Sequence, residues 1–297
     1  MSATRSPTTG QRYGVQRVCQ AWDVPRSSFY AWRTAQEAPP TPGGKRGPKT
    51  AQTDDALLTE IQGVLAASPF AGEGYRKVWA RLRVQHGVRV GAKRVLRLMR
   101  GAHLLSPHRR PKGEAKTHEG TITTAAPGVM WGTDGTKVLT VDDGYVWIFA
   151  AVEHWNAECV GAYVCKKGDR FNALQPIAQG LVAHYGGVTA GVARGLAVRM
   201  DHGSQYLADH FLNQLRHWGI APSFAFVAEP ETNGVAERFF RTLKEQTIYG
   251  RIFRNLEEVR HAVAAFVRRY NEEWLVQKLG FLSPSQARRR WHTAQAA

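Results

Sequence analysis

The chain has 297 residues, of which 43% are hydrophobic, so it is long and apolar enough for two or three domains with at least one sizeable core. Its three cysteines are too few and too scattered for a disulfide framework or a Cys-rich zinc site, and they fit reduced thiols in a cytoplasm. No apolar run reaches the length of a membrane span or of a signal-peptide core. These features exclude secreted disulfide-rich and membrane proteins, and we expect a soluble intracellular chain.

The formal net charge of +16 is distributed unevenly. Residues 1–126 carry 21 basic against 8 acidic side chains, whereas residues 127–297 carry 19 against 16. A strongly basic front half joined to a nearly neutral back half suggests a polyanion-binding module attached to a second, chemical one. A generic basic surface is the alternative, and charge alone does not separate the two.

Residues 1–36 predict a small helix-turn-helix. Tyr13, Val18 and Trp22 belong to an apolar stripe at helical spacing, Pro25 breaks it, and a second short helix follows. Arg26 and Arg33 flank that second helix and are candidate DNA contacts, although a helical hairpin that only packs would look the same. Residues 37–53 form a basic linker rich in proline and glycine.

Residues 54–106 predict a second helical unit, a DNA-binding domain of three helices. The last helix spans about residues 91–100 and turns Val95, Leu98 and Met99 inward. This leaves a basic outer face that can meet phosphates or the major groove, or is simply solvated. Its members are Lys93, Arg94, Arg97 and Arg100. Residues 107–126 read as a polar, basic linker between domains.

From residue 127 the pattern changes to strands, at about 129–141, 145–152, 160–165, 197–200 and 223–227. Helices are predicted at about 171–184, 207–218 and 234–249, so the order is three strands, helix, strand, helix, strand, helix. This order is that of a ribonuclease-H-like α/β core, a mixed five-stranded sheet with helices on both faces, over residues 127–250. Residues 251–297 form a C-terminal helical extension, with a helix at about 256–270.

Three carboxylates lie on three of these core elements. Asp134 interrupts an apolar strand, where a buried acid without a partner must neutralise or find a cation. Asp201 ends a short apolar strand, where sites of open α/β sheets collect, and Glu237 lies early in a helix. Each acid alone is more often a solvated surface group. Together they suit the binding of a pair of hard divalent cations for phosphoryl transfer.

Basic side chains continue the helix of Glu237. Arg241 and Lys244 lie about one and two turns further along the same stripe, and Arg238 is adjacent to Glu237. An intrahelical Glu–Arg pair would contribute only about 0.3–0.5 kcal/mol and would leave Lys244 unexplained. The pattern therefore favours a helix that lies against DNA beside a metal site.

These motifs resemble the DDE transposases of bacterial insertion sequences. The features that carry the resemblance are Trp131-Gly132-Thr133-Asp134, Asp201-His202-Gly203-Ser204-Gln205-Tyr206, the 35 residues between Asp201 and Glu237, and Lys244 seven residues on. The chain is most similar to the downstream-frame product of the group with two overlapping reading frames (the IS-three type), whose core resembles that of retroviral integrases. Gly74-Tyr75-Arg76 and Ser283-Pro284 extend the resemblance over about residues 54–290. Where many members carry Arg-Pro-His, this chain has Trp274-Leu275-Val276.

The resemblance implies a transposase that binds the terminal repeats of its element and then cuts and joins DNA. Asp134, Asp201 and Glu237 would hold two Mg²⁺ ions, with Mn²⁺ as a substitute. His202 and Asn233 would orient these acids, or are turn residues. The implied partners are the element ends, target DNA, further copies of the chain and an upstream-frame protein, in a bacterial cytoplasm on the nucleoid. A nuclease that cuts without joining and a non-catalytic DNA-binding regulator are the alternatives.

Overall fold

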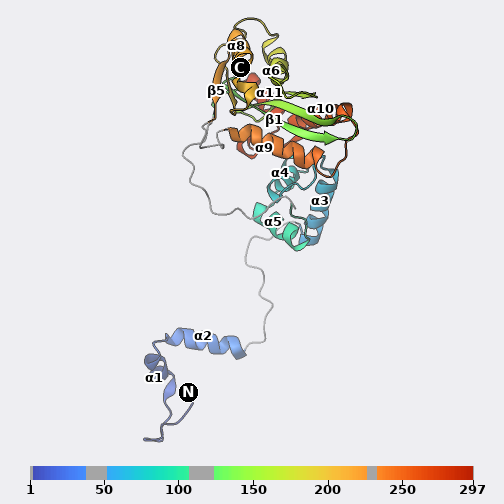
Figure 1. Cartoon of the computed structure of the whole chain (residues 1–297). Helices are drawn as coiled ribbons and strands as arrows, with labels where there is room; N and C mark the ends of the chain where they lie inside the picture. The colour runs from blue at the N-terminus through green and yellow to red at the C-terminus, as the bar shows by residue number, and fades with distance from the viewer. Residues whose placement is uncertain (1–2, 38–51, 107–123, 226–232, 297) are drawn as a thin grey trace. The chain divides into compact units, whose positions relative to one another are not determined.

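The computed structural model describes residues 3–37, 52–106, 124–225 and 233–296 (Figure 1). The chain forms two compact units, Met1–Thr53 and Asp54–Ala297. Most of the two linkers predicted at 37–53 and 107–126 lies outside the described residues. No helix in the described ranges has the length and apolar character needed to cross a bilayer.

The N-terminal unit contains the two predicted helices, α1 (Gly14–Ala21) and α2 (Arg26–Glu37). Asp23 makes the turn between them with a positive φ of 50°. The expected apolar stripe buries only Cys19, while Trp22 and Trp32 stay 66% and 62% exposed. The hairpin therefore has almost no core of its own, because two short helices cannot cover each other's aromatic side chains.

The second unit begins with three helices, as predicted: α3 (Asp54–Ala67), α4 (Tyr75–Gln85) and α5 (Ala92–Gly101). Their apolar faces meet in one small core, in which Val95 and Met99 are fully buried. The loop between α3 and α4 is tied to α4 by a buried ion pair, in which Arg81 Nε donates to Glu73 Oε2 over 2.6 Å.

A five-stranded mixed sheet follows in the order β3-β2-β1-β4-β5. Its strands are β1 (Met130–Thr140), β2 (Gly144–Glu153), β3 (Cys159–Cys165), β4 (Ala197–Met200) and β5 (Ala221–Phe224). The first three are antiparallel neighbours, and β4 and β5 join β1 in parallel. This topology confirms the predicted α/β, ribonuclease-H-like core.

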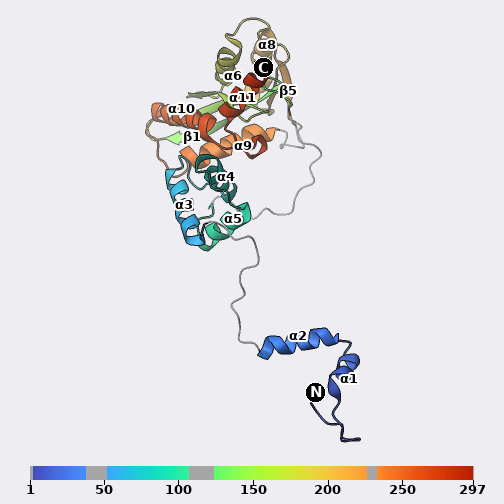
Figure 2. The same ribbon diagram turned by 180° about the vertical axis from the view of Figure 1, so that it is seen from behind.

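Helices cover both faces of the sheet (Figures 1 and 2). On one face, α6 (Arg170–Tyr185) and α8 (Asp209–His217) pack on Trp131 and Phe149. On the other, α9 (Gly234–Leu243) and α10 (Leu256–Glu273) pack on Val146 and Ile148. Two separate apolar clusters result, one on each side of the sheet.

Several predicted boundaries were wrong. The helix expected at 207–218 is two helices, because the chain turns extended at Ala208 between α7 (Ser204–Leu207) and α8. Strand β5 begins two residues before the predicted start. The helix expected at 234–249 ends as α-helix at Leu243 and continues as a π-helical turn, Lys244–Ile248. The C-terminal extension adds α11 (Pro284–Ala296), for which no range had been predicted.

Trp274, the first residue of the segment that departs from Arg-Pro-His, has a packing role. Its ring lies 4.9 Å from that of Phe70, edge to face, and 5.8 Å from that of Tyr270. Lys77 Nζ lies over the same ring. In this chain the segment therefore joins the three-helix module to the last helices of the core through an aromatic contact.

Candidate active site

Asp134 lies in the middle of β1, where it faces Ala150 of β2 in antiparallel register. Its Oδ1 accepts the backbone N–H of Gly135 over 2.7 Å. The pKa of Asp134 is raised to about 6, mainly by burial. The charges of Asp201 and Glu237 raise this pKa further, whereas the Gly135 N–H and the charge of Lys244 lower it. This strand acid is thus partly desolvated and lies within the electrostatic reach of the other two.

Asp201 directly follows β4, whose parallel pairing with β1 brings Arg199 opposite Gly132. The exposed Asp201 carboxylate accepts the N–H of Gly203 through Oδ1, over 2.9 Å, in the turn that leads into α7. Glu237 is exposed in the first turn of α9, where the helix dipole favours an acid. The three acids therefore come from a strand, a post-strand turn and a helix start, near the point where β4 ends beside the middle of β1.

The three acids do not form a closed ligand set as their side chains are placed. Among the described residues, no three carboxylate, imidazole or thiol groups lie close enough together to hold a metal ion. Their mutual electrostatic effect shows that they lie in one region, but their carboxylates would have to come closer together to share a cation.

Asn233 connects the helix of Glu237 to the strand of Asp134. Its side chain does not cap its own helix. Instead, Nδ2 donates to the carbonyl of Thr133 over 3.1 Å, in a buried position. The approach is close because Gly132 has no side chain: a Cβ there would lie 2.7 Å from Asn233 Oδ1 and 3.4 Å from Ala236 Cβ. Asn233 therefore sets the spacing between α9 and β1.

The basic residues predicted on α9 have different surroundings. Lys244 begins the π-helical turn and acts electrostatically on Asp134. Arg241 is 67% exposed and pairs with Glu245 over 2.9 Å, and Arg238 is exposed. His202 is exposed as well, and its ring stacks on Phe224 of β5 with the centroids 5.5 Å apart.

The basic face of α5 is partly used inside the module. Arg94 and Arg97 each reach the carboxylate of Asp54 at the start of α3, over 2.8 Å in both cases. Lys93 and Arg100 are exposed on the same helix. In the N-terminal unit, Arg26 and Arg33 are exposed on α2, and Arg33 pairs with Glu37 over 2.9 Å. Two of the predicted contacts on α5 therefore hold two helices together.

Two buried polar side chains near the acids were assigned no role from the sequence. Tyr206 is fully buried. Its burial raises the pKa of its hydroxyl well above the ordinary value, and the negative charges of Asp134 and Asp201 raise it further. His154 is 2% exposed, and its Nε2 would lie 3.0 Å from a Cβ on Gly132. Tyr206 shares a motif with Asp201, but no local pattern marks His154, which only the fold brings to β1.

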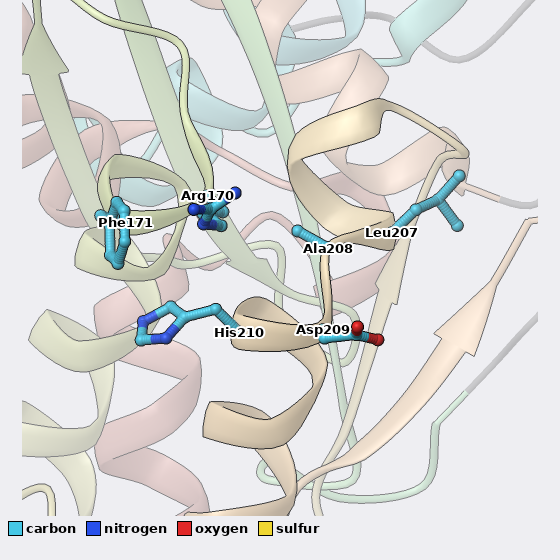
Figure 3. A pocket seen from close by; sticks show the side chains of 6 residues that line it. All are labelled: Arg170, Phe171, Leu207, Ala208, Asp209 and His210. Carbon is cyan, nitrogen blue, oxygen red and sulfur yellow. The ribbon is translucent and has the colours of Figure 1, made fainter.

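A hollow of about 520 Å³ lies beside α7, where α6 and α8 begin (Figure 3). Its lining residues are Arg170, Phe171, Leu207, Ala208, Asp209 and His210. Phe171 and His210 face each other with their ring centroids 4.6 Å apart. The three candidate acids do not line it, so this hollow is not the candidate site.

The chain matches two family models. Residues 218–284 match the one described as "Integrase core domain", which includes Glu237, and residues 52–112 match the one described as "HTH-like domain". A transposase for insertion sequence element IS629 of Shigella sonnei is 26% identical over 294 residues, covering 96% of this chain and 94% of that protein. Transposase InsD for insertion element IS2A/D/F/H/I/K of Escherichia coli is 28% identical over 253 residues, covering 82% of this chain and 81% of that protein.

Solved structures with a similar arrangement include two integrase catalytic cores. The core domain of BIV integrase is 19% identical with a TM-score of 0.42 and covers 57% of this chain and 99% of that one. The HTLV-2 integrase catalytic core domain in complex with magnesium is 14% identical with a TM-score of 0.42, and the match covers 55% of this chain and 98% of that one.

Proposed function

We propose that this chain, which is a DDE transposase of the insertion-sequence kind, cuts and joins DNA at the ends of its element with Asp134, Asp201 and Glu237 as metal ligands. The observation that carries the proposal is Asp134, a partly buried strand carboxylate whose pKa is raised to about 6 by burial and by the other two acids. Such a cluster of like charges is unfavourable without a cation. The integrase core domain itself implies dependence on a divalent metal.

The donor set fits Mg²⁺, or Mn²⁺ in its place, because all three ligands are hard carboxylate oxygens. Two ions bound there would activate the attacking oxygen and stabilise the leaving one. Asp134 supplies the fixed ligand, since β1 and the Gly135 N–H hold it. The side chains of Asp201 and Glu237 are exposed and would turn toward the same cations.

The reaction would be two successive phosphoryl transfers. In the first, water attacks a phosphodiester at an element end, and the new P–O bond displaces the 3′-oxygen, which leaves as a 3′-hydroxyl while the phosphate stays on the 5′ side of the cut. In the second, that hydroxyl attacks a phosphodiester of target DNA and displaces another 3′-oxygen. No covalent bond to the protein forms in either step, so the side chains act by positioning and by charge.

DNA would be held by basic side chains around this site. Lys244, with Arg241 and Arg238, would contact the end DNA beside the acids, and the helical parts would read the terminal repeats. On α5 the exposed Lys93 and Arg100 are the stronger candidates, since Arg94 and Arg97 are engaged by Asp54. Arg26 and Arg33 would contribute from the N-terminal unit.

Two DNA ends must meet for joining, so we infer an assembly of two or more copies on DNA, with an upstream-frame protein as a further partner. Such an enzyme would work in the bacterial cytoplasm, on the nucleoid.

The decisive experiment compares wild type with Asp201→Asn and, as a matched exposed carboxylate, Asp209→Asn. Each full-length protein is incubated with duplex DNA of its element's ends, plasmid target and Mg²⁺. We expect strand-transfer products from wild type and Asp209→Asn, none from Asp201→Asn, and equal end binding by all three. Substantial strand transfer by folded Asp201→Asn would refute the metal assignment.

The same reactions separate the alternatives. A nuclease would release cut ends from wild-type reactions without joined product. A regulator would bind the end DNA and show no Mg²⁺-dependent product at all.

A further inference from the structure

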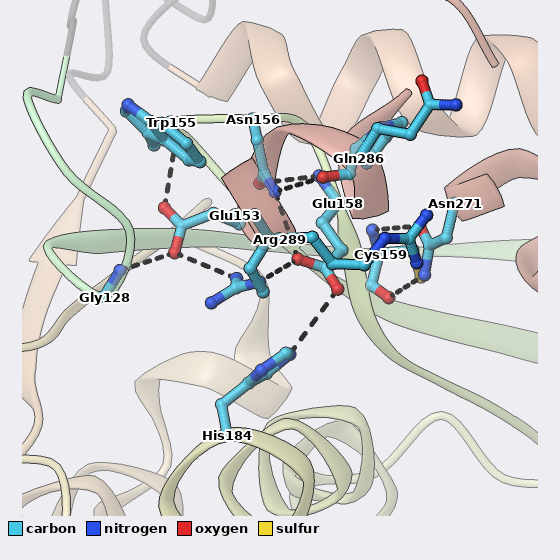
Figure 4. A network of polar contacts seen from close by, with 12 residues as sticks. Gly128, Glu153, Trp155, Asn156, Glu158, Cys159, His184, Asn271, Gln286 and Arg289 are labelled. Atoms are coloured by element: carbon cyan, nitrogen blue, oxygen red, sulfur yellow. Dashed lines mark hydrogen bonds and ion pairs between the residues drawn. The ribbon is translucent and has the colours of Figure 1, made fainter. Parts of the chain in front are cut away.

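The turn between β2 and β3 is held in place by the last helices of the chain (Figure 4). Buried Glu153 accepts the N–H groups of Gly128 over 2.7 Å and of Trp155 over 3.1 Å. Asn156 Nδ2 donates to the carbonyl of Pro284 over 3.0 Å, at the start of α11. Asn271 of α10 bonds both the N–H and the carbonyl of Cys159, each over 2.9 Å. The turn is thus fixed from several sides and cannot move independently of the core.

His154 lies in this fixed turn and points to the junction of β1 and α9. Its carbonyl accepts a bond from Lys278 Nζ over 2.7 Å, which anchors its backbone. Its ring is 2% exposed, so it cannot reach substrate. Burial, and then the charges of Lys278 and Arg199, lower the pKa of His154 to about 4, so the ring is neutral at physiological pH and carries one N–H.

The ring of His154 and the side chain of Asn233 meet over the same glycine. Nε2 of His154 lies 3.0 Å, and Oδ1 of Asn233 2.7 Å, from the place where a Cβ of Gly132 would be. Within the described part of the chain, neither atom has a hydrogen-bond partner, although both are buried, and the same holds for His154 Nδ1. A buried donor and a buried acceptor that stay unpaired have both given up water without compensation, which is unfavourable. An imidazole N–H at Nε2 and an amide oxygen are complementary, so pairing them removes the penalty at these two atoms.

We propose that His154 is a positioning residue whose Nε2–H holds Asn233 Oδ1, directly or through one ordered water. Asn233 in turn holds the Thr133 carbonyl, one residue before Asp134, and precedes the helix turn that carries Glu237. His154 therefore sets the distance between two of the three carboxylates. This inference rests on the proposed function, because it assigns the geometry of the same metal site.

The test uses full-length His154→Phe, His154→Gln and His154→Asn. Phenylalanine keeps the ring shape without a donor. The glutamine amide nitrogen replaces Nε2, whereas the shorter asparagine replaces Nδ1. We expect His154→Phe to lower the strand-transfer rate about 10–100-fold and to raise the Mg²⁺ concentration for half-maximal rate, with end-DNA affinity unchanged. His154→Gln should restore most of the rate and His154→Asn should not.

Two further measurements separate positioning from a general loss of stability. The rise in melting temperature on adding Mn²⁺ without DNA should shrink in His154→Phe and return in His154→Gln. The double variant His154→Phe/Asn233→Ala should be no slower than Asn233→Ala alone, because both act through one contact. Additive losses, equal activity of the glutamine and asparagine variants, or a wild-type Mg²⁺ response in His154→Phe would each overturn the proposal.

The Asp201→Asn control keeps the two proposals distinguishable. If Asp201→Asn is inactive and the His154 variants behave as wild type, only the role of His154 is wrong. If Asp201→Asn is active, the metal site itself is wrong.

Discussion

Among single residues, Asp134 shows how a side chain of the candidate site can lower the free energy of unfolding. Its carboxyl has a pKa of about 6 in the folded chain, against an ordinary value of 3.8. Between these two pH values the folded chain keeps a proton that the unfolded chain has released, so the free energy of unfolding falls as pH rises through this window. Above pH 6 the metal-free protein carries a penalty of at most ~3 kcal/mol, reduced by partial solvent access.

We therefore expect Asp134→Asn to stabilise the metal-free protein at pH 7.5 by about 1–2 kcal/mol, and by little near pH 4, because asparagine carries no charge to desolvate. Denaturant unfolding in EDTA at pH 4.5, 6 and 7.5 measures the difference. Mn²⁺ should raise the melting temperature of wild type and not that of the variant. A variant less stable than wild type at pH 7.5 would contradict this account of Asp134.

Among the elements, the loop between α3 and α4 depends on one buried ion pair. Arg81 bonds Glu73 through two nitrogens, over 2.6 and 3.1 Å, and the side chains are 4% and 1% exposed. Ser68 Oγ donates to the same carboxylate over 2.8 Å. The neighbouring Phe70 packs on Trp274, so this loop also joins the three-helix module to the core.

Arg81→Met should destabilise the protein by about 3–5 kcal/mol, because among the described residues it leaves the buried Glu73 carboxylate with Lys77, 3.9 Å away, as its remaining charged partner. The double variant Glu73→Gln/Arg81→Met should recover part of the loss. Equilibrium unfolding of wild type, both single variants and the double variant measures the coupling. If the double variant loses as much free energy of unfolding as the two single variants together, the two side chains are not coupled.

Across the whole molecule, the N-terminal unit stands apart by its excess of basic over acidic side chains. Residues 1–53 contain 8 basic and 2 acidic side chains, and they form a unit of their own. The exposed aromatic and basic side chains of this unit contribute little to a core, and this fits a role in binding.

A chain that begins at Asp54 should therefore still unfold cooperatively, near the temperature of the full chain. It should bind end DNA more weakly and with a shallower dependence on salt. The slope of the logarithm of the binding constant against the logarithm of the salt concentration should fall in magnitude by about 0.9 for each phosphate that is no longer neutralised. Binding titrations at several salt concentrations measure the slope, with full-length Arg26→Ala/Arg33→Ala as the comparison in which only charge is removed. An unchanged slope would show that the N-terminal unit does not touch the DNA.

Local sequence patterns were sufficient to predict the fold class and the order of the strands and of most helices. The apolar runs of β1 and β2 and the helical spacing of apolar residues in α5 involve only neighbouring residues, and they survive in the folded chain. The element ends were less predictable: the chain is extended at Ala208 between two helices, and a π-helical turn follows Leu243.

Which polar groups meet could be read only from the folded chain. Arg94 looked like a DNA contact on a helical face, but Asp54 on another helix engages it. His154 had no signal in the sequence, because its place beside Gly132 of β1 comes from a turn that α10 and α11 hold. Contacts between segments far apart in the chain are set by how the layers pack, and no local pattern records them.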